Sequence, residues 1–163
     1  VIVNDISAGK LDDQMIPVVS SLQVPYVLMH MKGTPQTMQE KPLYENISRE
    51  ILDFFINKVH EIREAGITDI IIDPGFGFGK AIRHNFQLLK NFSLFKMLGL
   101  PLLAGLSRKS TIYKTLNISP EDSMNGTTVL NTNSLQNGAS NLRVHDVKEA
   151  AEAIKLFAAY QEA

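Results

Sequence analysis

The sequence predicts an α/β fold in which the strands run parallel, and this prediction rests on three observations. Five short apolar segments alternate with helical stretches along the 163 residues. Segments in this order form right-handed β-α-β units. The segment Ile67 to Ile72 is rich in branched apolar residues, as in a strand that is buried on both faces. Two architectures satisfy the pattern: a doubly wound five-stranded sheet, or part of an eight-stranded β/α barrel, which in full needs about 250 residues.

The first half of the chain shows three strands and the helices that connect them. The strands are expected at Val1–Asn4, Pro25–His30 and Ile67–Asp73. A helical stretch from about Leu11 to Leu22 contains Pro17, which indicates that the helix begins late or kinks. The loop from Met31 to Leu43 is long for a strand-to-helix connection. The helix after it is amphipathic and ends at Gly66. Its apolar side consists of Ile47, Ile51, Leu52, Phe54, Phe55, Val59 and Ile62.

The second half continues the alternation. Strands are expected at Gly99–Leu106 and Asn141–His145, and helices at about His84–Leu98, Thr111–Leu116, Pro120–Asn137 and Val147–Tyr160. Asp146 stands directly before the last helix, where its side chain would cap the first turn.

The composition is that of one globular domain covering residues 1–163. The hydrophobic share is 44%, the charged share is 20% and the formal net charge is −1, so the chain can bury one sizeable core. This charge gives no basic field for nucleic acid or a membrane surface. The chain has no cysteine, which excludes disulfides and thiolate zinc sites and is compatible with a cytoplasmic protein. It begins with Val1, already inside a predicted strand, so we expect a piece of a longer chain.

The loop after the third predicted strand is the strongest indication of a site. Asp73 stands where the strand ends, Pro74 prevents its continuation, and glycines follow at positions 75, 77 and 79. The spacing G-x-G-x-G matches neither the dinucleotide fingerprint nor a P-loop, and Lys80 is followed by alanine rather than by a hydroxyl residue. Alternate glycines would let the backbone approach a flat ligand closely. The alternative interpretation is a strand-to-helix turn without a ligand.

Polar and ionisable residues stand at the end of every predicted strand. They are Asn4, Asp5, His30, Asp73, Ser107, Arg108, Lys109, Ser110, Arg143, His145 and Asp146. The carboxyl ends of parallel strands share one rim, so we expect these residues to gather there. Arg143 and His145 are two apart and point to the same side, where Arg108 and Lys109 would complete an anion site. The histidines show no metal-ligand spacing, and we expect no metal held by the protein itself.

These residue types suggest a reaction. Asp73 and Asn4 offer acceptors and an amide donor to the edge of a flat heterocycle that carries amino and ring N–H groups. Phe76 and Phe78 would cover its faces, and the anion site would hold a phosphate or pyrophosphate. The predicted reaction is transfer of a heterocyclic alkyl group with loss of pyrophosphate.

Five motifs resemble those of dihydropteroate synthases, in the same order and over essentially the whole chain. They are Asn4–Gly9, Tyr26–Pro35, Asp73–Lys80, Gly105–Ser110 and Leu142–Val147. The resemblance implies a pterin-binding TIM barrel of folate biosynthesis. Such an enzyme condenses 6-hydroxymethyl-7,8-dihydropterin pyrophosphate with p-aminobenzoate to give 7,8-dihydropteroate and pyrophosphate.

The resemblance also implies roles for particular residues. The pterin would be bound by Asn4, Met29, Asp73, Phe76, Gly105 and Lys109. The pyrophosphate would be held by Asn4, Arg143 and His145. The p-aminobenzoate site, where sulfonamides compete, would be bordered by Phe78, Ser107 and Lys109. The catalytic residues would be Lys109, Arg143 and His145. In this family the C–O bond is thought to break first, and Mg²⁺ would arrive with the pyrophosphate.

The chain departs from the family pattern in two respects. Family members begin with three more βα units, which supply a magnesium ligand and part of the p-aminobenzoate lid. Val1–Asn4 would therefore be the fourth barrel strand, and the chain an incomplete barrel of about five βα units with two exposed strand edges. In addition, Asn133, Gln136 and Asn141 stand where the family usually has apolar residues. Val129, Asn133 and Gln136 share the helix stripe expected to face the core, so we interpret the polar residues as solubilising changes or sequence errors.

Two alternatives to a dihydropteroate synthase stay open. One is a truncated pterin-binding module without turnover. The other is the methyltetrahydrofolate-binding domain of a cobalamin-dependent methyltransferase, which shares the Asn-Asp strand end but is disfavoured by Ser-Arg-Lys-Ser and Arg-Val-His. Full-length relatives are typically homodimers through their last helices, here Val147–Tyr160.

Overall fold

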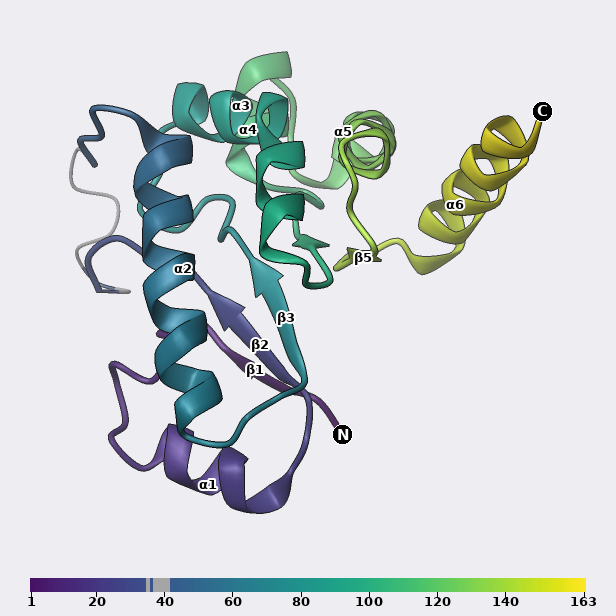
Figure 1. The fold of residues 1–163 in the computed structure, drawn as a ribbon. Helices are drawn as coiled ribbons and strands as arrows, with labels where there is room; N and C mark the ends of the chain where they lie inside the picture. The colour runs from purple at the N-terminus through teal and green to yellow at the C-terminus, as the bar shows by residue number, and fades with distance from the viewer. Residues whose placement is uncertain (35, 37–41) are drawn as a thin grey trace.

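A computed structural model describes residues 1–34, 36 and 42–163, and Figure 1 shows how its elements are arranged. The loop expected from Met31 to Leu43 lies partly outside the described residues. The strands are β1 (Val3–Asp5), β2 (Tyr26–Met29), β3 (Ile70–Asp73), β4 (Leu103–Ala104) and β5 (Asn141–Leu142). The α-helices are α1 (Met15–Leu22), α2 (Ile47–Glu64), α3 (Ile82–Lys90), α4 (Ser110–Leu116), α5 (Met124–Gln136) and α6 (Val147–Glu162), with 3₁₀ helices η1 (Phe92–Leu98) and η2 (Glu121–Ser123).

The described strands run parallel and follow one another in chain order. β2 lies between β1 and β3, and β4 pairs with β5. A parallel bridge between Ile72 and Leu102 connects β3 to the residue before β4. A doubly wound sheet reverses its strand order at a switch point, so the consecutive order of the described strands favours the barrel alternative.

Helix α2 lies across the sheet of β1, β2 and β3 (Figure 1) and packs its apolar side into the core. The predicted apolar residues are buried except Phe54, which is partly buried at the edge of the cluster. The first turn is fixed from both directions, because Asn46 Oδ1 accepts the N–H of Arg49 at 3.1 Å while Glu50 accepts the N–H of Asn46 at 3.1 Å. Gly66 follows the helix with a φ of 94°, a conformation that favours glycine.

The predicted helix His84–Leu98 is wrong as a single element, because the chain changes from α3 to η1 at Asn91. In a 3₁₀ helix residues three apart lie one above the other, so Phe92 and Phe95 face the same way. Both rings are fully buried. The Phe95 ring packs edge-on against Phe55, with 5.9 Å between the ring centroids. Residues three apart lie roughly 60° apart around an α-helix but in line along a 3₁₀ helix, so the tighter helix aligns the two aromatic rings against the core.

Helix α1 begins at Met15, later than the expected Leu11. Pro17 falls in its first turn, where the missing N–H would have had no partner within the helix. The late start predicted from this proline is therefore confirmed.

The prediction that Val129, Asn133 and Gln136 form the side of α5 that faces the core is wrong. Val129 is 52% exposed, Gln136 is exposed and Asn133 is only half-buried. The buried side consists of Thr127, Leu130, Asn131 and Ser134. The hydroxyls of Thr127 and Ser134 donate to carbonyls four residues earlier, at 3.0 and 2.8 Å. These bonds within the helix satisfy the two buried hydroxyls, whereas Oδ1 of the buried Asn131 has no hydrogen-bond partner among the described residues.

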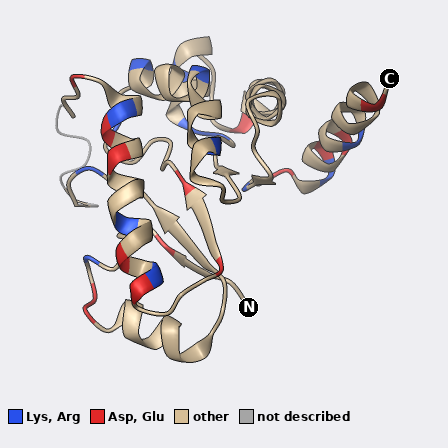
Figure 2. Cartoon of the chain, viewed as in Figure 1, with Lys and Arg blue, Asp and Glu red and all other residues tan. Residues whose placement is uncertain are grey.

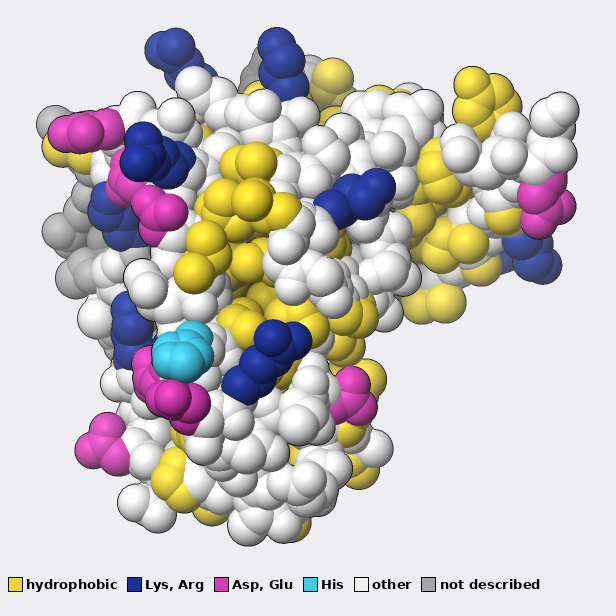
Figure 3. All heavy atoms as spheres, viewed as in Figure 1, with side chains coloured by type: hydrophobic (Ala, Val, Ile, Leu, Met, Phe, Trp, Pro, Cys, Tyr) yellow, Lys and Arg dark blue, Asp and Glu magenta, His cyan; other side chains and the backbone are white. Residues whose placement is uncertain are grey.

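The surface combines mixed charge with apolar areas. Charges of both signs are interspersed along α2 and α6 in Figure 2, and Figure 3 shows hydrophobic side chains gathered beside α2 and along α6. Helix α6 packs against α5 and extends away from the other elements (Figure 1). It exposes Leu156 and Tyr160 by 74% and 70%. Within the part of the chain that the structure describes, none of the helices has the length and apolar character needed to cross a bilayer.

Candidate active site

The sheet register brings predicted site residues to one face at the carboxyl ends of the strands. Met29 pairs with Asp73, and Asn4 pairs with Val27. Side chains two apart in a strand share a face, so Asn4, Met29 and Asp73 point the same way. β5 ends at Leu142 rather than at the expected His145. The main-chain N–H of Arg143 nevertheless donates to β4 at 3.0 Å, which keeps its side chain on this face.

Asp73 is fully buried and lies at the centre of this face. Its Oδ1 accepts the N–H of Gly75 at 2.8 Å. Its Oδ2 lies 3.0 Å from Nη2 of Arg143, but the pair lacks hydrogen-bond alignment, and among the described residues this oxygen has no hydrogen-bond donor. A buried carboxylate oxygen in this state is costly. It is therefore an acceptor available to a ligand.

The guanidinium of Arg143 lies over Gly105 and occupies the space that a side chain at position 105 would need. A Cβ at position 105 would stand 2.9 Å from Nη2 and 3.3 Å from Nε of Arg143, closer than van der Waals contact allows. Nη1 of the same guanidinium lies 3.4 Å from Oδ1 of Asn4. Glycine at 105 thus leaves the space in which Arg143 reaches both Asn4 and Asp73.

Lys109 extends from the start of α4 to the glycine loop. Its Nζ donates to the carbonyl of Phe76 and lies 4.9 Å from the centroid of the Phe78 ring, a cation–π distance. Burial lowers the pKa of Lys109 to about 8, while Asp73 raises it and Arg143 lowers it further. The amine can therefore gain or lose a proton near neutral pH.

Ser107 and His145 form a pair at the rim of the site. Ser107 Oγ accepts the main-chain N–H of His145 at 3.1 Å and lies 2.9 Å from Nδ1 of the same residue. The hydroxyl thereby fixes the imidazole while the residue stays exposed to solvent.

Arg108 does not belong to the anion site in which the sequence placed it. Its Nε and Nη2 donate to the carboxylate of Asp146 at 3.0 and 2.6 Å, a two-point ion pair. The hydrogen bond from Arg108 lowers the pKa of Asp146. Since Asp146 binds Arg108, the prediction that its side chain caps α6 is also wrong. The basic side chains left for an anion at this rim are Lys109, Arg143 and His145.

Phe76 was predicted to cover a ligand, and this prediction is wrong for its ring. The ring is fully buried and stacks on Phe92 with 5.9 Å between centroids, so it belongs to the core. The carbonyl of Phe76 contributes instead by accepting from Lys109. Phe78 is half-buried and is the aromatic side chain of the loop that faces the site.

Two glycines of the loop are required by contacts within the chain, and not by close approach to a flat ligand as the sequence suggested. A Cβ on Gly75 would overlap the carbonyl oxygen of His30, and a Cβ on Gly79 would overlap that of Lys32. Both glycines also have positive φ, 71° and 66°. The close approach is therefore between two segments of this chain, which lock the loop after β3 against the end of β2.

Lys80, for which the sequence predicted no role, is buried beneath this loop. Lys80 is 4% exposed, and burial lowers its pKa to about 7. Its neighbour His30 is also buried, and burial lowers the pKa of that imidazole to about 2, with Lys80 adding to the effect. The signal available in the sequence was a lysine that directly follows a glycine and precedes an amphipathic helix.

Asp5 was expected at the same rim, and its carboxylate is used internally. It accepts from the N–H and hydroxyl of Ser7, the N–H of Gly9 and the hydroxyl of Tyr26. Burial raises the pKa of Asp5, but these hydrogen bonds outweigh it and the pKa is lowered. Asp5 therefore holds the turn after β1.

A magnesium ion held by the protein does not fit the described residues. They include no group of three or more histidine, aspartate or glutamate side chains that could hold a metal. Of the carboxylates at the rim, Asp5 is occupied by Tyr26 and Asp146 by Arg108, which leaves a single oxygen of Asp73 without a hydrogen-bond donor among the described residues.

The comparisons with known proteins agree with this geometry. The family model described as pterin binding enzyme matches residues 1–145. Dihydropteroate synthase of Escherichia coli (strain K12) is 39% identical over 157 residues, which are 95% of this chain and 55% of that protein. The bifunctional dihydropteroate synthase/dihydropteroate reductase of Helicobacter pylori is 40% identical over 161 residues, 99% of this chain and 42% of that protein.

Solved structures show the same relation. The dihydropteroate synthase of Yersinia pestis with a sulfonamide drug complex superposes with a TM-score of 0.96 at 36% identity, covering 99% of this chain and 59% of that one. That of Xanthomonas albilineans in complex with 7,8-dihydropteroate gives 0.91 at 35% identity, covering 99% and 60%. These neighbours imply a TIM-barrel fold.

The chain belongs to the family of pterin-binding enzymes, as its match to the family model over residues 1–145 shows. The resemblance to dihydropteroate synthases drawn from the motifs is confirmed. The chain spans 55% of the Escherichia coli protein that it matches.

Proposed function

We propose that the chain carries the pterin and pyrophosphate sites of a dihydropteroate synthase, a transferase of folate biosynthesis. The observation that carries the proposal is the buried Oδ2 of Asp73, an acceptor without a hydrogen-bond donor among the described residues, at the centre of a cationic rim. A heterocycle with adjacent amino and ring N–H groups supplies the donors that this oxygen lacks.

In this proposal the pterin lies against the face formed by Asn4, Met29, Asp73 and Gly105. Asp73 accepts from the amino and ring N–H groups, and Asn4 offers both an acceptor and a donor. Met29 pairs with Asp73 in the sheet register and, unlike Phe76, lies outside the core cluster, so it gives the face its apolar floor. Lys109 stands at the side where the carbonyl of Phe76 holds its ammonium, within reach of a ring oxygen or nitrogen.

The pyrophosphate lies where Asn4, Arg143 and His145 come together. Arg143 reaches Asn4 at 3.4 Å and remains about one-third exposed, so its outer N–H groups face solvent and an incoming anion. When the C–O bond breaks, negative charge develops on the departing pyrophosphate. Preorganised cations lower the energy of that state more than water does. Magnesium would come with this substrate and needs no ligand from the described residues.

The p-aminobenzoate site is bordered by Phe78, Ser107 and Lys109. The half-buried Phe78 ring offers an apolar face, and the ammonium of Lys109 attracts the carboxylate. Sulfonamides share the arylamine and would compete at this place. The Yersinia pestis neighbour, whose structure is with a sulfonamide drug complex, supports this part of the proposal.

The chain is proposed to begin at the fourth strand of the barrel and to form about five of its eight βα units, as one domain over residues 1–163. The support is its coverage of 59% of the Yersinia pestis chain at a TM-score of 0.96 and the consecutive order of its strands. Asn4 and Asn141, on the inner faces of the two outermost strands, are exposed. A pterin-binding module without turnover is the alternative that this coverage leaves open.

Assembly and location belong to the same proposal. A second copy would dock on α6, where Leu156 and Tyr160 are exposed beside a groove of about 330 Å³ between α5 and α6. Sedimentation of a Leu156→Glu variant tests this, with a dimer lost on substitution as the expected result. The cysteine-free composition supports a cytoplasmic protein.

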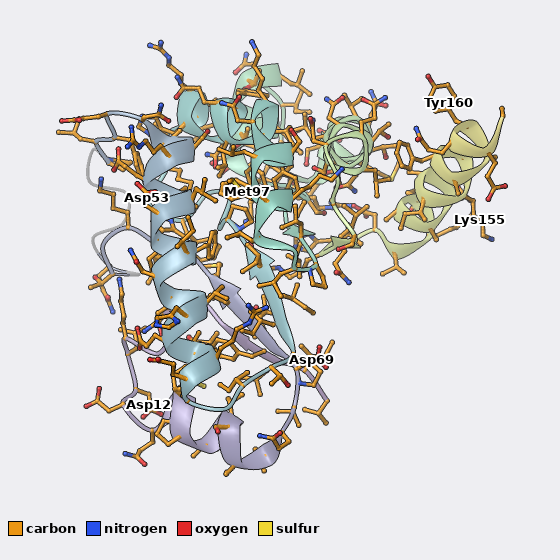
Figure 4. All side chains as sticks on the ribbon, in the orientation of Figure 1. Asp12, Asp53, Asp69, Met97, Lys155 and Tyr160 are labelled. Atoms are coloured by element: carbon orange, nitrogen blue, oxygen red, sulfur yellow. The ribbon has the colours of Figure 1, made fainter. Side chains whose placement is uncertain are left out.

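The test is a calorimetric titration of this chain with pterin-6-carboxylate. Saturable binding is expected, with at least tenfold weaker binding in Asp73→Asn, because the amide presents donors where the ligand needs an acceptor. Asp69→Asn is the matched control, since Asp69 is exposed and lies at the opposite end of β3 (Figure 4). Equal binding by both variants would overturn the site. No binding from a folded wild-type chain would mean that the preceding units are required for the pocket.

A further inference from the structure

The ammonium of Lys80 joins two segments that carry the site. Its Nζ lies 2.9 Å from the carbonyl oxygen of Gly75 and 3.0 Å from that of Phe78, both in the loop after β3. It also lies 3.3 Å from the carbonyl oxygen and 3.1 Å from Nδ1 of His30, at the end of β2. One buried side chain therefore fixes both segments.

Other contacts show that these segments meet closely. The hydroxyl of Tyr44 donates to the carbonyl of Gly79 at 2.9 Å, and the glycines at 75 and 79 leave room for the backbone of residues 30 and 32. The middle of the loop is also held by the N–H of Gly77, which donates to Oδ1 of Asn85 at 2.8 Å, and by the N–H of Phe78, which donates to the carbonyl of Gly75 at 3.1 Å. Lys80 adds the bond that fixes the carbonyl of Phe78.

The middle of the loop contains the two residues that contact the ammonium of Lys109. Phe78 is held through its carbonyl by Lys80 and presents its ring to Lys109 at 4.9 Å. Phe76, two residues earlier, accepts from Lys109 through its carbonyl. A shift of this backbone would move both contacts of the Lys109 ammonium together.

We propose that Lys80 is a positioning residue, which fixes the backbone of residues 75–80 so that Phe76 and Phe78 hold Lys109 in place at the p-aminobenzoate site. The identity of that ligand rests on the proposed function, whereas the effect on Lys109 does not. Burying an ammonium is costly unless its donors are bound, and here carbonyl oxygens and an imidazole surround it. The charged groups that act on Lys80 are Asp73 and Lys109.

The absence of cysteine from the sequence allows an exact replacement of the ammonium. Lys80→Cys is alkylated in denaturant with 2-bromoethylamine, which restores the length and charge of lysine, or with 1-iodopropane, which restores the length alone. Both forms are refolded. Lysine labelled with ¹³C at Cε reports on Lys109, whose signal is assigned through Lys109→Met. Lys90→Cys, treated in the same two ways, is the matched control, because Lys90 is an exposed lysine at the end of α3.

The aminoethyl form is expected to keep the ring-shifted Lys109 signal and its titration near pH 8. The propyl form is expected to lose the ring shift, to raise the Lys109 midpoint by one unit or more, and to bind p-aminobenzoate at least tenfold more weakly. The two Lys90 forms should not differ. Identical Lys109 signals in both Lys80 forms would overturn the proposal. A propyl form that fails to fold while the aminoethyl form folds would also overturn it, because the ammonium would then be needed for the whole fold. If no form binds p-aminobenzoate, the proposed function fails while the Lys109 signals still decide the role of Lys80.

Discussion

Replacing Gly105 by alanine should weaken the ion pair between Arg143 and Asp73, although neither of these two residues is mutated. The new Cβ would stand 2.9 Å from Nη2 of Arg143, so the guanidinium has to move by roughly 0.6 to 1 Å to reach van der Waals contact. The distance to Oδ2 of Asp73 then grows from 3.0 Å to about 4 Å, which at an effective dielectric constant of 20 removes about 1 kcal/mol of attraction. Arg143 is about one-third exposed, and solvent screening reduces this to about 0.5 to 1 kcal/mol.

Urea unfolding of four chains measures the effect: wild type, Gly105→Ala, Arg143→Ala and the double variant. Gly105→Ala should lower the free energy of unfolding by about 0.5 to 1 kcal/mol in the wild-type background and by less than about 0.3 kcal/mol with Arg143→Ala. An equal loss in both backgrounds would refute the reasoning, because Gly105 would then act on the strand and not through the guanidinium.

Two further predictions concern stability. Between about pH 7 and pH 10 the unfolded chain binds more protons than the folded one, since burial lowers the pKa of Lys80 to about 7 and of Lys109 to about 8. The free energy of unfolding should therefore rise with pH across this window, and the rise should shrink in Lys80→Met; a flat profile in the wild type would contradict it. Asn46→Ala removes the side chain that caps α2 and should cost about 1 kcal/mol in urea unfolding, whereas Asn57→Ala, on the exposed side of the same helix, should cost much less.

The fold could be predicted where a local pattern decides it. The alternation of segments predicted the parallel strands but left two sheet architectures open, and the apolar spacing of α2 predicted its buried side. The prediction failed where packing between distant segments decides. The change from α3 to η1 aligns Phe92 and Phe95 for burial in the core, and α5 turns Thr127, Leu130 and Ser134 toward the other elements in place of Val129. Hydropathy carries neither kind of information.

The sequence was sufficient to predict which residues lie at the site, but it was less informative about which partners those residues bind. Strand ends gave Asn4, Asp73 and Arg143, and the register brings them to one face. Partner choice among charged residues was not predictable, so Arg108 was assigned to an anion although it binds Asp146. The glycines were read as space for a ligand, while two of them leave space for another part of the chain. Such choices depend on which backbones meet in three dimensions.

The charges around Asp73 explain how a chain with a net charge of −1 can hold an anion. One buried carboxylate cannot balance Lys80, Lys109 and Arg143, and Arg143 is one cause that lowers the pKa of Lys109, after burial, to about 8. An anion that binds beside Lys109 adds negative charge and raises this pKa, so binding at pH 8 should take up as much as about half a proton. Titration with sulfate, which does not ionise near this pH, in buffers of different ionisation enthalpy measures the uptake, and Lys109→Met should abolish it. A binding enthalpy independent of buffer would mean that the anion binds away from Lys109, and Lys109 would then have no part in holding an anion at this rim.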